Sequence, residues 1–330
     1  MIKTIIFDGY AFAQKKEEIL RQKVAKIIAS KDIQPKIAAI LFKEDTGSLI
    51  YTAKKHEAAQ RVGISYDVHK FSMLDDVDLI LQKMRELNRD EQVTGIIVQK
   101  PWRKTWENVQ AEKERQQQSA SREVDEDKNQ ARGELKNFQK WWNVLIAAID
   151  ENKDVDGLHP NTLQAVKENR WQQEGKVLPA TCKAVLEILG EAKSELLKIN
   201  NSHPFINDQA KTIIIGRSEL LGKPLYYELL NQNKNVELIG RKEFNQRIEE
   251  KKYLLDADIV VSSTGIHQLV QAHMLKEDVV LVDVGEPQPD VDYAKVTEKA
   301  AFLTPVPGGV GPMTVVCLLE NCVDMLYYQS

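Results

Sequence analysis

A tyrosine and a lysine four residues apart are the first candidates for chemistry in this sequence. Tyr51 and Lys55 lie in the segment Ser-Leu-Ile-Tyr-Thr-Ala-Lys-Lys, which reads as a helix, and a spacing of four places both on one helical face. A lysine whose pKa is lowered by burial can exchange protons at neutral pH, and a tyrosine can orient it. On spacing alone, such a pair is more commonly found at a solvated surface.

Two further polar residues accompany predicted turns. Gln99 directly follows the apolar run 95–98, at the end of a predicted strand, where the ligand crevices of α/β proteins open. Asp156 lies in the sequence Asp-Val-Asp-Gly, where its carboxylate could accept two N–H groups from a heterocyclic ring, although Asp-Gly is also a routine turn. We expect the nearby His159 to be structural rather than catalytic.

The segment 303–314 has the most unusual composition of the chain. Five of the six residues from 307 to 312 are proline or glycine, and apolar sequence flanks the segment on both sides. Proline fixes φ and glycine lets another molecule approach the backbone. A rigid loop of Pro307, Gly308 and Gly309, followed by Thr314, could therefore bind a flat ligand. The alternative is a tight turn at the start of a helix.

Alternating strands and helices are expected to position these residues. Apolar patterns in the first part of the chain predict helices at 13–30, 51–62 and 74–87 and strands at 36–42, 66–71 and 95–98. The second part has predicted strands at 212–215, 236–239, 259–262 and 279–284, with helices at 184–189, 221–231, 244–251 and 315–328. Strands that alternate with helices favour parallel sheets, so the predicted class is α/β. The second part has the rhythm of a Rossmann-like domain.

The first strand of that second part ends in a glycine-containing turn. Gly216 permits a tight turn, Ser218 can cap the next helix, and Gly222 lets that helix pack closely on the sheet. Free N–H groups at a helix start favour a phosphate, although the spacing is not the usual G-x-G-x-x-G. The next strand ends at Gly240-Arg241, and a basic residue there favours NADP over NAD. The alternative for Arg241 is a solvated surface charge.

The composition narrows the class of protein. Hydrophobic residues make up 42% of the chain and the net charge is −4, which favours a globular protein and gives no sign of nucleic-acid or membrane binding. We expect no membrane span. The three cysteines show no metal-ligand spacing, so we expect reduced thiols, a cytoplasmic location and no metal. Residues from about 103 to 140 are mostly charged and read as an exposed insertion rather than core.

Taken in order, these segments resemble the bifunctional methylenetetrahydrofolate dehydrogenase/cyclohydrolase family over nearly the full chain. The proline–glycine loop is the most specific match. The other matching segments are Asp8-Gly9; Ser48, Tyr51 and Lys55 with Gly63-Ile64; Val98-Gln99 and Pro101; 153–157 with His159-Pro160; Gly216-Arg217-Ser218 with Gly222 and Pro224; 257–260; and Asp283-Val284-Gly285.

The resemblance implies two α/β domains around a cleft, the second a Rossmann-like NAD(P)-binding domain. Residues 1–180 and 308–330 would form the folate-binding catalytic domain, with the charged insertion inside it, and 181–307 the NADP-binding domain. The family oxidises 5,10-methylenetetrahydrofolate with NADP and hydrolyses the methenyl product to 10-formyltetrahydrofolate. The resemblance also implies a homodimer.

The resemblance also implies a role for each residue that occupies a position of the family's motifs. Lys55 would be the central catalyst, Gln99 would hydrogen-bond it, Tyr51 would stack on the folate and Asp156 would anchor the pterin. The cofactor would contact Gly216, Arg217, Ser218, Arg241, Thr181 and Gly265. The substrate would also meet Pro307, Gly308, Gly309 and Thr314, which form part of the cleft wall.

The sequence also departs from the family pattern. Lys100 and Arg103 stand where the family has Leu-Pro-Leu-Pro after the glutamine, and Lys100 adds a charge near the expected site. Arg241 replaces a serine, and Glu286 an isoleucine. Three alternatives therefore stay open: a dehydrogenase with weakened cyclohydrolase, a catalytically silent folate- or nucleotide-binding protein, and another Rossmann dehydrogenase acting on a small acid.

Overall fold

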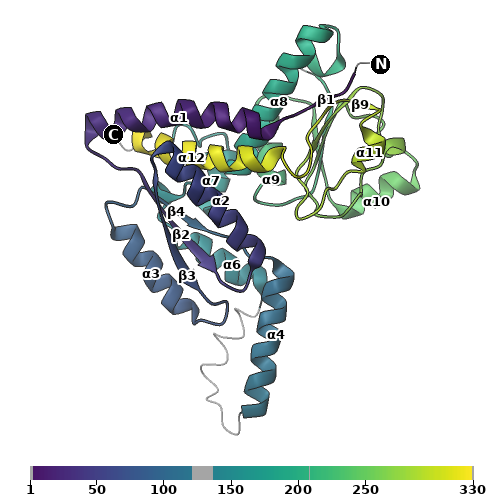
Figure 1. Cartoon of the computed structure of the whole chain (residues 1–330). Helices are drawn as coiled ribbons and strands as arrows, with labels where there is room; N and C mark the ends of the chain where they lie inside the picture. Colours follow the sequence, from purple (N-terminus) through teal and green to yellow (C-terminus); the bar gives the residue numbers. More distant parts are fainter. Residues whose placement is uncertain (1–2, 121–136, 208, 329–330) are drawn as a thin grey trace. The chain divides into compact units, whose positions relative to one another are not determined.

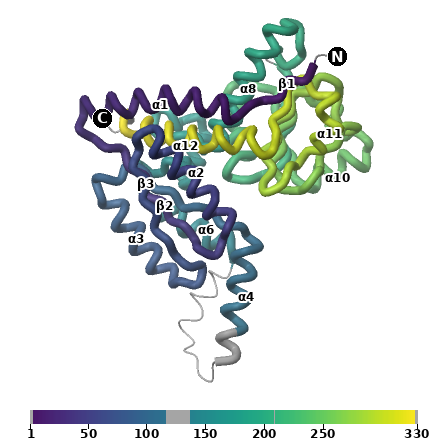
Figure 2. The backbone as a smooth tube through the Cα atoms, in the orientation of Figure 1, coloured from purple at the N-terminus to yellow at the C-terminus, as the bar shows by residue number. Residues whose placement is uncertain are grey.

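The computed structural model describes residues 3–120, 137–207 and 209–328, with side chains except at 116–120 and 328 (Figures 1 and 2). The chain divides into two compact units, each built from two stretches of sequence. One, the three-stranded unit, comprises Leu20–Asn161 and Cys322–Ser330, and the other, the six-stranded unit, comprises Met1–Ile19 and Thr162–Asn321. The domain boundaries predicted from the sequence are defined by the ligand that each domain would bind, and they stay a prediction.

The three-stranded unit is built on a parallel sheet in the order β3-β2-β4. The strands are β2 (Lys36–Phe42), β3 (Ser65–Phe71) and β4 (Gly95–Val98). Strand β2 is central and buried from Ile37 to Phe42, as its continuous apolar sequence requires. The helices of this part of the chain are α1 (Gly9–Lys31), α2 (Thr46–Val62), α3 (Val77–Arg89), α4 (Arg103–Ala120) and α6 (Phe138–Ala147), followed by the 3₁₀ turn η1 (Glu151–Lys153).

The helix boundaries in this unit have local causes. Helix α2 ends at Gly63, whose φ of 84° is left-handed and whose N–H donates to the carbonyls of Ala59 and Gln60. Helix α3 begins after Asp76, whose side chain accepts the N–H of Asp78. Helix α2 packs against β2 and β3.

The six-stranded unit is a parallel sheet in the order β1-β9-β8-β7-β5-β6. Its strands are β1 (Ile5–Ile6), β5 (Thr212–Ile215), β6 (Val236–Ile239), β7 (Ile259–Ser262), β8 (Val279–Asp283) and β9 (Ala300–Leu303). Its helical segments are α7 (Pro160–Lys167), α8 (Ala180–Ile199), η2 (Pro204–Ile206), α9 (Gly222–Asn231), α10 (Arg241–Glu249), η3 (Ala272–Met274), α11 (Tyr293–Val296) and α12 (Val310–Tyr328). Helices α8 and α9 lie on one side of the sheet and α10 and α11 on the other (Figure 1), which is the Rossmann arrangement.

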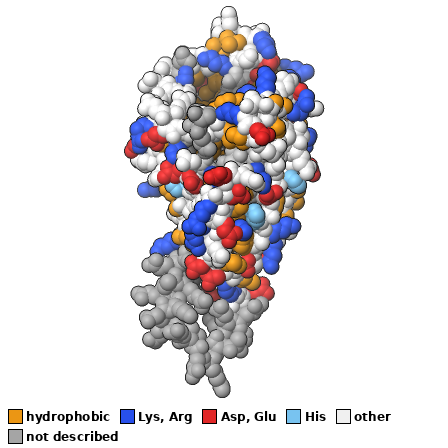
Figure 3. Space-filling view, turned by 90° about the vertical axis from the view of Figure 1, so that its left-hand side faces the viewer, with side chains coloured by type: hydrophobic (Ala, Val, Ile, Leu, Met, Phe, Trp, Pro, Cys, Tyr) orange, Lys and Arg blue, Asp and Glu red, His pale blue; other side chains and the backbone are white. Residues whose placement is uncertain are grey.

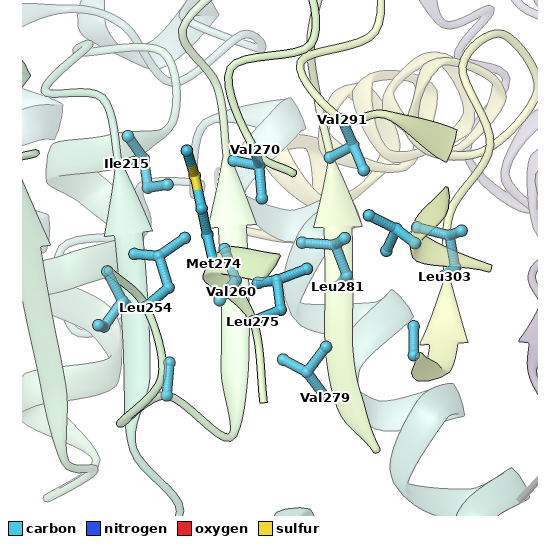
Figure 4. Packing of buried hydrophobic residues seen from close by; sticks show 14 of the residues in the cluster. Ile215, Leu254, Val260, Val270, Met274, Leu275, Val279, Leu281, Val291 and Leu303 are labelled. Atoms are coloured by element: carbon cyan, nitrogen blue, oxygen red, sulfur yellow. The ribbon is translucent and has the colours of Figure 1, made fainter. Parts of the chain in front are cut away.

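One face of this sheet carries a dry core of aliphatic side chains. Val260, Val279, Leu281 and Leu303 contribute from neighbouring strands, and Leu275 packs over them from the η3 segment (Figure 4). All of these side chains are buried. The alternating α/β class predicted from the sequence is therefore confirmed, and the second part of the chain is Rossmann-like.

The sequence analysis missed several elements, among them helices α6, α7 and α11, and the extent of others. Strands β1 and β9 were not predicted, because each is short and β1 lies far in sequence from its partner β9. Helix α8 runs over 20 residues from Ala180 to Ile199, whereas the sequence pattern predicted a helix only at 184–189. Buried residues such as Ala192 and Leu196 on one face stabilise the longer helix despite its polar exposed side.

The charged insertion is anchored at both ends, which corrects the expectation that it lacks core residues. Trp106 of α4 and Phe138 of α6 are buried and pack with Trp141, with ring centroids 5.6 to 6.0 Å apart. The predicted insertion between 121 and 136 lies outside the described residues. On the face shown in Figure 3, the described Lys/Arg and Asp/Glu side chains are interspersed rather than separated by sign.

Helix α12 combines the length of a membrane span with burial inside the structure. Within the described residues, the stretch Val310–Tyr327 is long and apolar enough by length and composition, but 61% of it is buried inside the structure. Such burial is typical of the core helix of a soluble protein. Glu320 and Asp324 interrupt its apolar sequence, so no unbroken apolar run there reaches about 20 residues.

An ion network at the edge of the six-stranded unit leads to a prediction about acid stability. Arg247, whose side chain is 6% exposed, donates to Asp256 at 2.9 Å and to Glu237 at 2.6 Å. Partial burial opposes ionisation, but hydrogen bonds from Lys211 and Arg247 outweigh it and lower the pKa of Asp256 to about 2. Because this folded-state pKa lies below that of the unfolded chain, the stabilisation is present above about pH 4 and is lost as the pH falls through 2.

We therefore expect Asp256→Asn to lower the free energy of unfolding by about 1–2 kcal/mol at pH 7, after allowance for solvent screening. The difference from the wild type should shrink as the pH falls from 4 towards 2. Urea unfolding at a series of pH values measures it. A difference that grew on acidification would contradict the assignment.

Candidate active site

Lys55 occupies the buried face of helix α2. Its side chain is 6% exposed, and its Nζ donates to Oε1 of Gln99 at 2.9 Å. Gln99 directly follows β4, and its backbone N–H donates to the carbonyl of Ile40 at 2.9 Å, which continues the sheet pairing past the end of the strand. The half-buried Tyr51 lies one helical turn before Lys55. The structure therefore brings Lys55 and Gln99 together as expected.

Asp156 belongs to the same unit and is held by the turn around it. Asp154 pairs with Ile96 alongside β4, and its carboxylate accepts the N–H groups of Leu158 and His159 at 3.0 and 2.9 Å. Asp154 is thus the structural aspartate of the motif. The half-buried Asp156 is left to the site, where burial raises the pKa of its carboxyl group and the positive charge of Lys55 opposes that rise.

Gly95 explains how the aspartate turn comes so close to β4. A Cβ on Gly95 would lie 2.2 Å from a methyl carbon of Val155, so only glycine permits this packing. His159 is structural, as expected, since it is buried and its Nδ1 accepts the N–H of Asn161 at the start of α7.

A clamp that the sequence analysis missed fixes the segment after Gln99. Asp45 is buried, and its Oδ2 accepts from the Ser48 hydroxyl and from the N–H of Trp102 at 3.2 Å. The signal in the sequence was Asp45, a residue type preferred at the N-cap, directly before α2, although its side chain makes no capping hydrogen bond. The Lys100 ammonium lies over the rings of Trp142 and Phe138, at 5.1 and 5.9 Å from their centroids.

The proline–glycine loop lies in the six-stranded unit and is held by the Asp8-Gly9 motif. The N–H of Gly9 donates to the carbonyl of Gly308 at 3.0 Å, and a Cβ on Gly9 would lie 1.9 Å from the Gly309 carbonyl oxygen. Gly308 has a φ of 105°, which favours glycine. Helix α12 begins at Val310, so the segment is partly a helix-entry turn, and the Thr314 hydroxyl donates to the Val310 carbonyl at 3.3 Å.

A second glycine cradle lies between β5 and α9. A Cβ on Gly222 would lie 1.8 Å from the Gly216 carbonyl oxygen, and one on Gly216, whose φ is 113°, would lie 2.6 Å from the Ser263 carbonyl oxygen. The Ser218 hydroxyl accepts the N–H groups of Leu221 and Gly222 at 3.3 and 3.4 Å, although the N-cap position of α9 itself is occupied by Leu221 and not by Ser218. A backbone this closely packed at a helix start fits the phosphates of a dinucleotide.

The charged side chains around this cradle differ from the expectation in one respect. Arg217 reaches across to the end of β6 and pairs with Glu243 at 3.0 Å, whereas Arg241 is exposed at the start of α10. Gly265, with a φ of 68°, lies in the loop after β7, and Thr181 in the first turn of α8. Glu243 was missed because it lies three positions beyond Gly240, in the first turn of α10 rather than directly at the strand end.

Two family models match this chain. Residues 7–126 match the catalytic domain of tetrahydrofolate dehydrogenase/cyclohydrolase, and residues 179–330 match the NAD(P)-binding domain of the same family. Together they cover most of the chain.

Individual proteins match over nearly their full length. The chain is 31% identical to the bifunctional protein FolD of Pelagibacter ubique, covering 97% of both chains. It is 32% identical to the bifunctional protein FolD of Lactobacillus acidophilus, covering 98% of both chains. The solved structure of the bifunctional enzyme FolD from Campylobacter jejuni has a TM-score of 0.74 and 28% identity, over 99% of this chain and 100% of that one.

Proposed function

The chain belongs to the tetrahydrofolate dehydrogenase/cyclohydrolase family, and we propose that Lys55, Gln99 and Asp156 carry its two reactions. These reactions are the NAD(P)-dependent oxidation of 5,10-methylenetetrahydrofolate and the hydrolysis of 5,10-methenyltetrahydrofolate to 10-formyltetrahydrofolate. The buried Lys55–Gln99 hydrogen bond, in the same unit as Asp156, is the observation that carries the assignment. It combines a proton-exchanging group, an orienting amide and an anchoring carboxylate.

The family resemblance, together with the positions of the side chains, supports the proposed binding roles. Asp156 can accept N–H groups from the edge of a pterin, and Tyr51 supplies a ring on which the folate can stack, one helical turn from Lys55. The Gly216–Gly222 cradle with Arg217 and Ser218 would hold the cofactor phosphates. The nicotinamide supplies the hydride acceptor.

Lys55 acts in the hydrolytic step. Because methenyltetrahydrofolate is a cation, it repels a protonated lysine and favours the neutral amine. A neutral Lys55 can accept a proton from water while the water oxygen bonds to the methenyl carbon and the C=N π electrons return to nitrogen. Lys55 then gives this proton to N5 as the C–N5 bond breaks, and the hydroxyl proton leaves to solvent, so that the formyl group remains on N10. The side-chain oxygen of Gln99 holds the amine in one orientation by accepting a hydrogen bond from it.

The dehydrogenase-only alternative rested on the charge of Lys100 and on the altered loop after Gln99. The Lys100 ammonium lies over the aromatic rings of Trp142 and Phe138, and this placement supports the bifunctional assignment over the first ground of that alternative. We also propose a preference for NADP, supported by Arg217 and Arg241 beside β6. A homodimeric state and a cytoplasmic location are supported by the family resemblance, and analytical ultracentrifugation tests the former.

An absorbance assay with methylenetetrahydrofolate tests the proposed function, with NADP⁺ and NAD⁺ in parallel. We expect reduced cofactor with little free methenyl product, and acid should then convert the formyl product to methenyl. Methenyl accumulating to the level set by the buffer alone would indicate a dehydrogenase without hydrolase. No reduction with either cofactor would favour a silent binding protein.

A further inference from the structure

The loops after β5 and β6 lie side by side at the carboxyl edge of the six-stranded sheet. The N–H of Gly216 donates to the carbonyl of Ile239 at 3.0 Å, which joins the two strand ends. Arg217 extends from the first loop over the second, with its Cδ 3.3 Å from the point that a Cβ on Gly240 would occupy. The guanidinium therefore lies at the end of β6.

Glu243 meets Arg217 there and is fixed by the backbone. Its Oε1 pairs with the Arg217 guanidinium at 3.0 Å, and its Oε2 accepts the N–H of Gly240 at 3.0 Å. Backbone N–H groups at the start of α10, and then the charge of Arg217, lower the pKa of Glu243, so the carboxylate is ionised at neutral pH. A permanent negative charge is therefore held beside the arginine.

In dinucleotide-binding domains, this strand end lies beside the adenosine ribose. An acidic residue there hydrogen-bonds the 2′-hydroxyl of NAD, whereas an arginine accommodates the 2′-phosphate of NADP. This chain carries both residue types, already paired with each other. Binding of NADP must separate the pair or bring the phosphate close to the Glu243 carboxylate, while NAD can use that carboxylate as a hydrogen-bond acceptor.

We propose that Glu243 is a specificity-determining residue that competes with the 2′-phosphate for Arg217 and so weakens the preference of this enzyme for NADP over NAD. The inference rests on the proposed NAD(P)-dependent function. It adds a residue whose effect is confined to the choice between the two cofactors, because the two differ only at the 2′ position.

The test is the ratio of the dissociation constants of NAD and NADP, measured by calorimetric titration of the full chain without folate. Glu243→Gln removes the charge but keeps an acceptor for the Gly240 N–H, so the helix start is preserved. Glu277→Gln is the matched control, since Glu277 is also exposed and also forms an ion pair, with Lys299 at 3.4 Å. It lies just before β8, at the amino-terminal ends of the strands and therefore away from the carboxyl ends where Glu243 lies. A thermal melt of each variant checks folding.

We expect Glu243→Gln to shift the ratio about tenfold towards NADP, the size of a charge repulsion of this kind at a partly exposed site, and Glu277→Gln to leave it unchanged. The shift should be larger at low ionic strength. An unchanged ratio, or an equal loss for both cofactors, would show that Glu243 only caps α10 and would overturn the proposal. Wild-type protein that bound neither cofactor would instead overturn the proposed function itself.

Discussion

Replacing Lys55 by methionine is expected to lower the rate of methenyltetrahydrofolate hydrolysis by about a thousandfold, within the range typical of a lost general acid–base group. Methionine preserves the length and burial of the side chain but cannot exchange a proton. Hydride transfer moves no proton, so cofactor reduction should fall much less. The variant is therefore expected to accumulate methenyl product while it still reduces the cofactor.

Two measurements separate this chemical effect from damage to the fold. Lys54→Met is the matched control: Lys54 precedes Lys55 in the same helix but is exposed, with its ammonium 5.7 Å from the centroid of the Tyr51 ring. Its loss could alter folate stacking on Tyr51 but removes no proton-exchanging group, so the ratio of hydrolysis to cofactor reduction should stay near that of the wild type. Thermal melting should show Lys55→Met to be folded, because a buried amine is replaced by an apolar side chain. Hydrolysis by Lys55→Met at the wild-type rate would exclude Lys55 as the proton-exchanging group.

The α/β class and most of the site-bearing elements were predictable because they depend on local patterns. The buried runs of β2 and β4, the left-handed stop at Gly63 and the turn after Gln99 each leave a signal within a few residues. The pairing of Lys55 with Gln99 could be expected only from the family resemblance, since the two residues are 44 positions apart.

The features that were missed depend on approaches between distant segments. In the sequence, Gly9 reads as an ordinary turn residue. In the structure, the carbonyls of Gly308 and Gly309 leave no space for a side chain at this position. Strand β1 has too few residues to show a period and is stabilised by pairing with β9, almost 300 residues later. Glu243 reads as a helix-start acid, and only its ion pair with Arg217, which comes from the loop after β5, connects it with the choice of cofactor.

Gly222→Ala is the second change for which we expect a large effect. The new methyl carbon would lie 1.8 Å from the Gly216 carbonyl oxygen and 2.8 Å from its carbonyl carbon. Both are backbone atoms, so the clash cannot be relieved by turning a side chain, and the turn between β5 and α9 has to open. We expect the free energy of unfolding to fall by about 3 kcal/mol and the affinity for NADP to fall at least about tenfold.

Gly190→Ala provides a matched comparison, because the same substitution meets a different environment. Gly190 lies inside α8, is exposed, and a Cβ there would meet nothing within 4 Å. Alanine should therefore raise the free energy of unfolding by about 0.5–1 kcal/mol, the ordinary difference in helix propensity, with cofactor affinity unchanged. Urea unfolding and NADP titration of both variants measure the contrast. A Gly222→Ala protein that bound NADP as tightly as the wild type would show that the β5–α9 turn is not the phosphate cradle, because a turn forced open at Gly216 could not keep its N–H groups in place.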